Sequence, residues 1–283
     1  MRIKKISNLE SNCLPRPKKR FGQNFLVNPA SSIKIVKLAG IEPSDTVLEI
    51  GPGRGAITRL LAEKGCRVIA LEVDRELCKT LSHEFGSCEN VRVVETDALE
   101  FDFNSLPSAP GDRIKVVANL PYNVATPILF RLLESRNMID CMVLMFQKEV
   151  ASRIVASPGG KSYGALSIFP QLYSDISLSF KLSPGSFFPP PKVDSAVLFF
   201  KILERPRFDV ADEDLLSGLV KAAFSQRRKK LSNSLKRFFD NAENSDIIFS
   251  KAGIDPSRRA ETISVEEFCR MSNLLAETMK SEP

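Results

Sequence analysis

The fold class follows from one segment, Val47-Leu48-Glu49-Ile50-Gly51-Pro52-Gly53-Arg54-Gly55. With Thr46, its first residues form a short apolar run that predicts a buried strand, and the pattern of residues 56–64 predicts a helix. The glycines between them allow a tight turn and let a ligand approach the backbone closely. A strand, a glycine turn and a helix in this order predict an α/β protein with a nucleoside-cofactor site at the turn.

The same alternation continues downstream. A helix-period segment covers residues 75–84, and further apolar runs predict strands at residues 67–71, 91–95, 114–118 and 142–146. Short apolar strands separated by helices predict a parallel sheet that helices cover on both faces. The later runs have few helices between them and predict an antiparallel edge, with strands at residues 165–172, 176–182 and 196–203.

The strand signals stop near Glu204, and the rest of the chain is helical in pattern. Apolar residues recur at helical spacing in residues 212–224, 226–239, 246–251 and 265–279. We therefore predict a basic N-terminal arm at residues 1–20, an α/β domain at residues 21–204 and a smaller all-helical domain at residues 205–283.

The formal net charge of +6 on the 283 residues is unevenly placed. Residues 1–20 hold seven lysines and arginines and one acid, which equals the whole net charge. Residues 221–237 hold seven more basic residues and no acid, so the remainder of the chain is acidic. Two basic regions on an acidic body favour a polyanionic partner. A basic tail and a solvated helix face are the alternative interpretation.

The composition argues against several classes of protein. A single histidine, His83, speaks against a multi-histidine metal site and a histidine-dependent triad, so we expect no metal. The six cysteines form no C-x-x-C pair and indicate free thiols in a reducing compartment. Without an apolar run of membrane-spanning length or a secretory signal, we expect a cytoplasmic protein that does not bind membranes. Nothing in the sequence indicates an oligomer, and we expect a monomer.

Two acids extend the cofactor hypothesis. Glu72 ends the next predicted strand, where its carboxylate can bind both hydroxyls of a ribose. The pattern Gly51-x-Gly53-x-x-Ala56 matches the dinucleotide fingerprint, so NAD remains open, whereas E-x-G-x-G-x-G is associated with S-adenosylmethionine. Asp97 favours the second cofactor, because a carboxylate after the third strand can accept a hydrogen bond from the adenine amino group. A helix N-cap is an equally good interpretation of Asp97.

The segment Asn119-Leu120-Pro121-Tyr122 follows the fourth strand, at the edge where ligands of open α/β sheets collect. The amide of Asn119 is neither acid nor nucleophile, but its oxygen can accept an N–H bond from an aromatic amino group. Such a bond favours a tetrahedral nitrogen with a localised lone pair, which can attack a sulfonium methyl in line. Pro121 stiffens the turn, and Tyr122 supplies a flat face for stacking an extruded base. An ordinary turn at the end of a strand is the alternative.

A second aromatic segment, Phe187-Phe188-Pro189-Pro190-Pro191-Lys192-Val193, precedes the last predicted strand. Consecutive prolines make a stiff extended segment that can hold an aromatic ring beside a pocket. Phe187 or Phe188 can therefore hold the other face of the base, although a packing role for one of them is at least as good an interpretation.

These motifs resemble those of the ribosomal-RNA adenine N6,N6-dimethyltransferases of the KsgA type, over nearly the whole chain from about Lys18. The matching segments, in order, are Phe21-Gly22-Gln23-Asn24-Phe25-Leu26, Leu48-Glu49-Ile50-Gly51-Pro52-Gly53-Arg54-Gly55, Asn119-Leu120-Pro121-Tyr122 and the phenylalanine–proline segment continuing as Asp194-Ser195-Ala196-Val197. The resemblance implies a Rossmann-like S-adenosylmethionine-dependent methyltransferase domain followed by an RNA-binding helical domain.

The resemblance also implies roles for single residues. The methyl donor would be bound by Asn24, Leu26, Gly51, Gly53, Glu72 and Asp97, with Asn119 at the transfer site. Tyr122 and Phe187 would flank the target base, beside Leu120 and Pro121. The implied substrate is a pair of adjacent adenosines in the 3′-terminal hairpin loop of small-subunit ribosomal RNA, dimethylated on immature small subunits.

One departure from the family pattern is Lys230, where threonine is expected. It leaves a run of four cations, Arg227, Arg228, Lys229 and Lys230, which would contact RNA phosphates. Three alternatives stay open: a large-subunit RNA methyltransferase of the antibiotic-resistance type, a DNA adenine methyltransferase, and a protein that acts chiefly as a subunit assembly factor.

Overall fold

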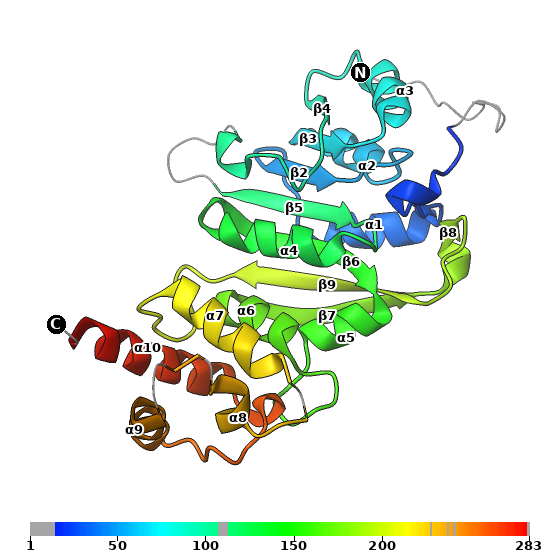
Figure 1. Ribbon diagram of the computed structural model, residues 1–283. Coiled ribbons are helices and arrows are strands. Elements are labelled where there is room, and N and C mark those ends of the chain that lie inside the picture. Colours follow the sequence, from blue (N-terminus) through cyan, green and yellow to red (C-terminus); the bar gives the residue numbers. More distant parts are fainter. Residues whose placement is uncertain (1–14, 107–112, 227, 237, 240–241, 282–283) are drawn as a thin grey trace.

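The computed structural model describes residues 15–106, 113–226, 228–236, 238–239 and 242–281 (Figure 1). Its centre is a seven-stranded sheet in the order β4-β3-β2-β5-β6-β9-β7. The five parallel strands are β2 (Thr46–Ile50), β3 (Arg67–Glu72), β4 (Val91–Glu95), β5 (Ile114–Asn119) and β6 (Ile139–Gln147). The strands β7 (Ser174–Leu182) and β9 (Ser195–Ile202) run antiparallel to β6 and to each other, as predicted for this edge.

Both faces of the sheet are buried, because neighbouring residues of each strand point to opposite sides. Val47 and Val68 pack on one side with α1 (Pro29–Leu38) and α2 (Thr58–Glu63). Leu48 and Ile69 pack on the other side with α4 (Ala125–Glu134). This two-sided burial explains why the strands read as continuous apolar runs, and it confirms the predicted layering. The remaining connections include α3 (Arg75–Phe85) and α5 (Lys148–Ile154).

Residues 165–172 were predicted as a strand, and this prediction is wrong. They belong to the helix α6 (Ala165–Tyr173). The Ser167 hydroxyl accepts the backbone N–H of Gly164 at 3.1 Å and donates to the Arg153 carbonyl at 2.6 Å, which fixes the first turn. Most residues of α6 are buried, and its polar side chains, Ser167 and Gln171, bond to backbone carbonyls of the preceding segment. They do not form an exposed polar face, so the apolar run resembles a buried strand.

The C-terminal part is helical, as predicted, with α7 (Glu213–Phe224), α8 (Leu231–Leu235), α9 (Ala242–Ala252) and α10 (Val265–Ser281). In Figure 1, α8, α9 and α10 lie below the β7 edge of the sheet, and α7 overlaps that edge in the view. A continuous helix over residues 226–239 was predicted, but among the described residues only Leu231–Leu235 is α-helical there, and Lys229 closes a turn by donating to the Gln226 carbonyl. None of the described helices is both long and apolar enough to cross a membrane.

Apolar residues of the C-terminal helices, such as Leu216 and Leu219, belong to the same core cluster as Tyr173 and Ile202 of the sheet region. The division of the chain at residues 204 and 205 falls between β9 and α7, and it remains a proposal about domains that share one hydrophobic core. A separate two-stranded sheet joins β1 (Phe25–Leu26) to β8 (Phe187–Phe188), two segments far apart in the sequence.

Candidate active site

The strand order places the glycine turn beside the Asn119 segment. The turn follows β2, Asn119 ends β5, and these two strands are hydrogen-bonded neighbours. The chain runs from β2 toward β3 and β4 on one side and reaches β5 and β6 on the other, so the strand order reverses between β2 and β5. Ligands of open α/β sheets bind at the carboxyl ends of the strands at such a reversal.

A pocket opens at this point. Most of the residues that were predicted to bind a cofactor or a base line it: Asn24, Gly51, Gly53, Glu72, Asn119, Leu120, Pro121 and Tyr122. Phe21, Gly22, Gln23, Phe25 and Val73 complete the lining. The motifs from four distant parts of the sequence therefore meet in one place.

The glycines of the turn are required by their geometry. Gly51 and Gly53 have φ angles of +68° and +57°, in the left-handed region that disfavours side chains. A Cβ added to Gly53 would lie 2.8 Å from Cδ1 of Phe25, and one added to Gly51 would lie 3.6 Å from the Asn119 carbonyl oxygen. The turn thus lies directly under the Phe25 ring and beside Asn119, with no room for a side chain at Gly53.

Glu72 holds the turn from the end of β3. Its carboxylate is buried, with one oxygen accepting the N–H of Gly53 at 3.1 Å and the other accepting the N–H of Asp74 at 3.0 Å. Burial raises the pKa of Glu72 above its ordinary value. Since each carboxylate oxygen has a second lone pair, both oxygens can still accept a hydrogen bond from a ligand hydroxyl.

Glu49 is a further buried acid, two residues before Gly51 in β2, and its burial was not predicted from the sequence; it does not line the pocket. It is 1% exposed in the middle of the sheet, and its Oε2 has no hydrogen-bond partner among the described residues. Burial, together with the nearby charge of Glu72, raises the pKa of Glu49 to about 8. The signal in the sequence was the presence of a carboxylate inside an otherwise apolar strand.

The side chain of Asn119 is oriented by a backbone contact. Its Nδ2 donates to the carbonyl oxygen of Asn24 at 3.0 Å. Only the amide nitrogen can donate to a carbonyl, so this contact fixes which end of the amide is which. The Oδ1 atom is thereby presented as the acceptor.

Tyr122 and the two phenylalanines differ in their surroundings. The Tyr122 hydroxyl is hydrogen-bonded to the Ser195 hydroxyl at 2.5 Å, which holds the ring at the pocket wall, and burial raises the Tyr122 pKa. Phe187 is 3% exposed and packs in the core, whereas Phe188 is 50% exposed. This difference follows from the alternation of side chains along β8. The Arg54 guanidinium lies 5.3 Å from the centre of the Phe188 ring.

Two predicted cofactor residues lie outside the pocket lining. Leu26 is buried in the core and pairs with Phe187 across β1 and β8. Asp97 is exposed after β4, and its carboxylate accepts the N–H of Leu99 at 2.9 Å, as expected for a turn or cap. The backbone of this region is nevertheless close to Glu72, because Thr96 donates to the Glu72 carbonyl at 3.0 Å.

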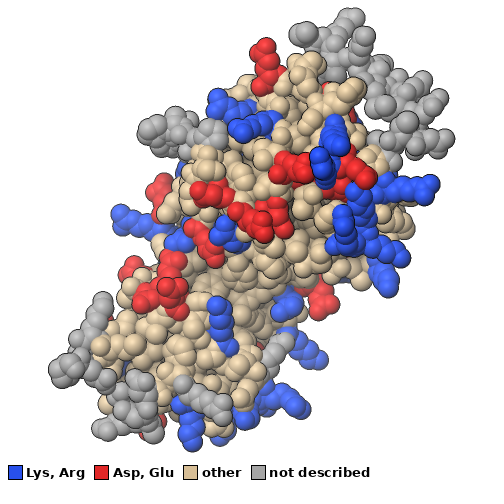
Figure 2. All heavy atoms as spheres, turned by 45° about the horizontal axis from the view of Figure 1, so that its top comes forward, with Lys and Arg blue, Asp and Glu red and all other residues tan. Residues whose placement is uncertain are grey.

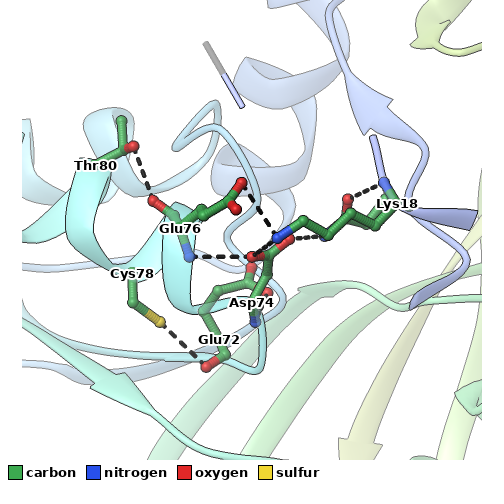
Figure 3. A network of polar contacts seen from close by, with 7 residues as sticks. Lys18, Glu72, Asp74, Glu76, Cys78 and Thr80 are labelled. Carbon is green, nitrogen blue, oxygen red and sulfur yellow. Dashed lines mark hydrogen bonds and ion pairs between the residues drawn. The ribbon is translucent and has the colours of Figure 1, made fainter. Parts of the chain in front are cut away.

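The N-terminal segment covers the pocket and is held by an acid that sequence reasoning also missed. Lys18 donates to Asp74 Oδ1 at 2.7 Å and lies 3.2 Å from Glu76, and Gln23 donates to Asp74 Oδ2 at 3.0 Å (Figure 3). Residues 15–20 of the predicted arm are therefore partly packed on the protein, and residues 1–14 lie outside the described residues.

Basic side chains gather on one side of the molecule, beside a group of acidic ones (Figure 2). In the arm, Arg16, Lys19 and Arg20 are exposed. The C-terminal cations Arg228, Lys229 and Lys230 are also exposed and lie in the turn before α8, away from the pocket lining, while Arg227 lies outside the described residues.

Comparison with known proteins identifies the family of the chain. The family model described as ribosomal RNA adenine dimethylase matches residues 15–277. A protein of Geobacter metallireducens named "Ribosomal RNA small subunit methyltransferase A" is 45% identical over 92% of this chain and 96% of its own. A protein of Magnetococcus marinus with the same name is 44% identical over 91% of each chain.

Two solved structures share the fold over most of the chain. A dimethyladenosine transferase from Plasmodium falciparum has a TM-score of 0.72 and 28% identity, covering 90% of this chain and 98% of its own. The 23S rRNA methyltransferase ErmE has a TM-score of 0.65 and 25% identity, covering 89% of this chain and 100% of its own. The fold is thus that of a Rossmann-like methyltransferase with a helical C-terminal part. The chain belongs to the ribosomal RNA adenine dimethylase family.

Proposed function

We propose that this enzyme transfers methyl groups from S-adenosylmethionine to the N6 atoms of two adjacent adenosines in the 3′-terminal hairpin loop of small-subunit ribosomal RNA, in the cytoplasm and on immature subunits. One observation carries the proposal: at the strand-order reversal, the Asn119 amide is held by the Asn24 carbonyl so that its oxygen is left as an acceptor. The relatives named for the small subunit support the choice of RNA.

The pocket fits a nucleoside-containing methyl donor. Gly51 and Gly53 leave the backbone of the turn without side chains, so that a ligand can approach it closely, and the paired oxygens of Glu72 suit the two hydroxyls of a ribose. We assign donor binding to Asn24, Gly51, Gly53, Glu72 and Asn119, with Asp97 reaching the adenine and Leu26 contributing from the β1 backbone. When bound, S-adenosylmethionine supplies an electrophilic methyl group.

Asn119 acts on the nitrogen that accepts this methyl group. Its Oδ1 accepts an N–H of the adenine amino group, which favours a tetrahedral nitrogen and localises the lone pair for attack. Because Nδ2 is already engaged by Asn24, the amide needs no reorganisation at the moment of reaction. Asn119, Leu120 and Pro121 thus form the wall against which the amino group is oriented.

Stacking holds the extruded base. Tyr122 offers one face, and its hydroxyl bond to the buried Ser195 keeps the ring from rotating away. Phe187 was expected to flank the other face, but it is buried in the core and is not among the residues that line the pocket. Phe188 is half exposed and lies beside Arg54, and it does not belong to the pocket lining either. We propose Tyr122 together with a phenylalanine of β8 as the two faces.

Donor binding tests the cofactor assignment. We predict that titration calorimetry of the full chain detects S-adenosylhomocysteine at micromolar concentrations and no binding of NAD⁺ at about a hundredfold higher concentration. Glu72→Gln should weaken binding about tenfold to a hundredfold, because the hydrogen bonds to a ribose lose their charged acceptor. The matched control is Glu95→Gln, the exposed neighbour of Glu72 in the β3–β4 register, which should bind as wild type does. Preferential binding of NAD⁺ would contradict the assignment.

The ErmE structure supports a second candidate, methylation of large-subunit RNA. Its identity of 25% is well below the 45% of the small-subunit relatives, so we place it second. The variant Asn119→Ala distinguishes catalysis from an assembly role without catalysis. It should abolish methylation while leaving RNA binding largely intact.

A further inference from the structure

Residues 18–25 form a strap over the pocket. Its last five residues, from Phe21 to Phe25, all line the pocket. At one end β1 pairs with β8, and directly before β1 the Asn24 carbonyl accepts the N–H bond from Asn119. The strap is thus bonded to Asn119 and lies beside the glycine turn and Glu72 in the pocket lining.

The other end of the strap is attached to Asp74. This residue is 1% exposed, and its carboxylate accepts hydrogen bonds from Lys18, from Gln23 and from the N–H of Glu76 (Figure 3). Lys18 also donates its backbone N–H to the side-chain oxygen of Gln23 at 2.7 Å, so the two strap residues approach Asp74 as a unit. Although burial acts in the opposite direction, the bonds from Lys18 and Gln23 hold the pKa of Asp74 below its ordinary value.

Asp74 is also connected to the ribose carboxylate. Its backbone N–H donates to Glu72 Oε1 at 3.0 Å, and Glu72 Oε2 accepts the N–H of Gly53 at 3.1 Å. A continuous set of hydrogen bonds therefore runs from the strap through Asp74 and Glu72 to the glycine turn. A cap of α3 needs only the bond from Glu76 to Asp74 and explains neither of the two strap bonds.

We propose that Asp74 is a positioning residue that latches the strap closed over the methyl donor and keeps Glu72 directed at the ribose. The role of the donor rests on the proposed function, whereas the closure of the strap does not. Lys18 is ion-paired with Asp74 in this latch. In the described part of the arm, the cations available to RNA are therefore the exposed Arg16, Lys19 and Arg20.

The latch is tested first without any ligand. Hydrogen exchange of the full chain is followed at the strap amides of Phe21 and Gly22, which are hydrogen-bonded within the strap. Asp74→Asn keeps a good N-cap for α3 but removes the charge that Lys18 needs. We expect about tenfold faster strap exchange. The double variant Lys18→Met, Gln23→Leu leaves Asp74 and its cap unchanged and should give the same result.

The control is Glu76→Gln, which removes the exposed second acid near Lys18 and should change strap exchange less than about twofold. Wild-type exchange in Asp74→Asn, or equal loosening in Glu76→Gln, would overturn the latch.

The second measurement is donor affinity and steady-state kinetics. In Asp74→Asn we expect the Kd of S-adenosylhomocysteine and the KM of the donor to rise about tenfold, while kcat at saturating donor stays within about twofold. A fall in kcat with unchanged KM would contradict a positioning role. If the wild-type chain binds no S-adenosylhomocysteine, the proposed function fails, and the exchange result still decides whether the strap is latched.

Discussion

Glu49 shows how one residue links the fold to the site. It lies directly before the glycine turn, yet it is buried with a carboxylate oxygen unpaired among the described residues. Burial in the sheet disfavours the charged carboxylate and raises the pKa of Glu49 to about 8, so the protonated form predominates at neutral pH in the folded protein. In the unfolded chain the same carboxyl has an ordinary pKa of about 4.3.

We predict that Glu49 makes the protein less stable as the pH rises from about 5 to 8. In that range the unfolded chain releases the Glu49 proton and the folded protein keeps it, so rising pH favours unfolding. Each pH unit can remove up to about 1.4 kcal/mol. The glutamine in Glu49→Gln does not titrate. The free energy of unfolding in urea, taken as variant minus wild type, should therefore increase as the pH rises across this range. Exposed Glu89→Gln is the control. Parallel pH profiles of wild type and Glu49→Gln would contradict the buried, protonated acid.

Among the elements, β8 shows where sequence reasoning reached its limit. The parallel strands, the glycine turn and the antiparallel edge were predicted because buried strands have a strong apolar signal. Which of Phe187 and Phe188 faces the core depends on the pairing of β8 with β1, more than 150 residues earlier in the chain. The error at α6 and the contacts of Gln23 and Asp74 have the same cause, because tertiary neighbours decide them and local sequence does not report them.

The two phenylalanines are separated by single substitutions. Phe187→Leu removes a ring from the core, and we expect it to lower the free energy of unfolding by about 1–3 kcal/mol. Phe188→Leu changes an exposed ring and should leave stability within about 0.5 kcal/mol of wild type. If Phe188 stacks on RNA, the KM of the Phe188→Leu variant for RNA should be about fivefold higher than that of wild type, or more. A rise confined to Phe187→Leu, at equal folded protein, would instead assign the stacking face to Phe187.

At the scale of the whole molecule, the cations that we expect to contact RNA lie in two regions with different surroundings. Among the exposed arm cations, Arg16 precedes the strap, and Lys19 and Arg20 belong to it. Arg228, Lys229 and Lys230 lie in the turn between α7 and α8 (Figure 1). The net charge of +6 therefore says little by itself, because its distribution carries the information.

Neutralising the C-terminal cations should weaken RNA binding to a similar extent whatever the RNA sequence. We expect replacement of Arg228, Lys229 and Lys230 by glutamine to lower the slope of log affinity against log salt by about 2, since each phosphate contact contributes about 0.7–0.9. Fluorescence anisotropy from 50 to 300 mM salt measures the slope. The control replaces three exposed lysines by glutamine: Lys37 of α1, Lys64 directly after α2 and Lys79 of α3. Equal slopes for the two triple variants would restore the interpretation of a solvated basic surface.

The most direct test of the central claim is mass spectrometry of digested ribosomal RNA. Immature small subunits that lack the modification are incubated with S-adenosylmethionine and either wild-type protein or Asn119→Ala. We predict N6,N6-dimethyladenosine at two adjacent positions of the 3′-terminal hairpin with the wild type and none with the variant. Unmodified hairpin RNA after incubation with folded, donor-binding wild-type protein, or methylation confined to large-subunit RNA, would contradict the account.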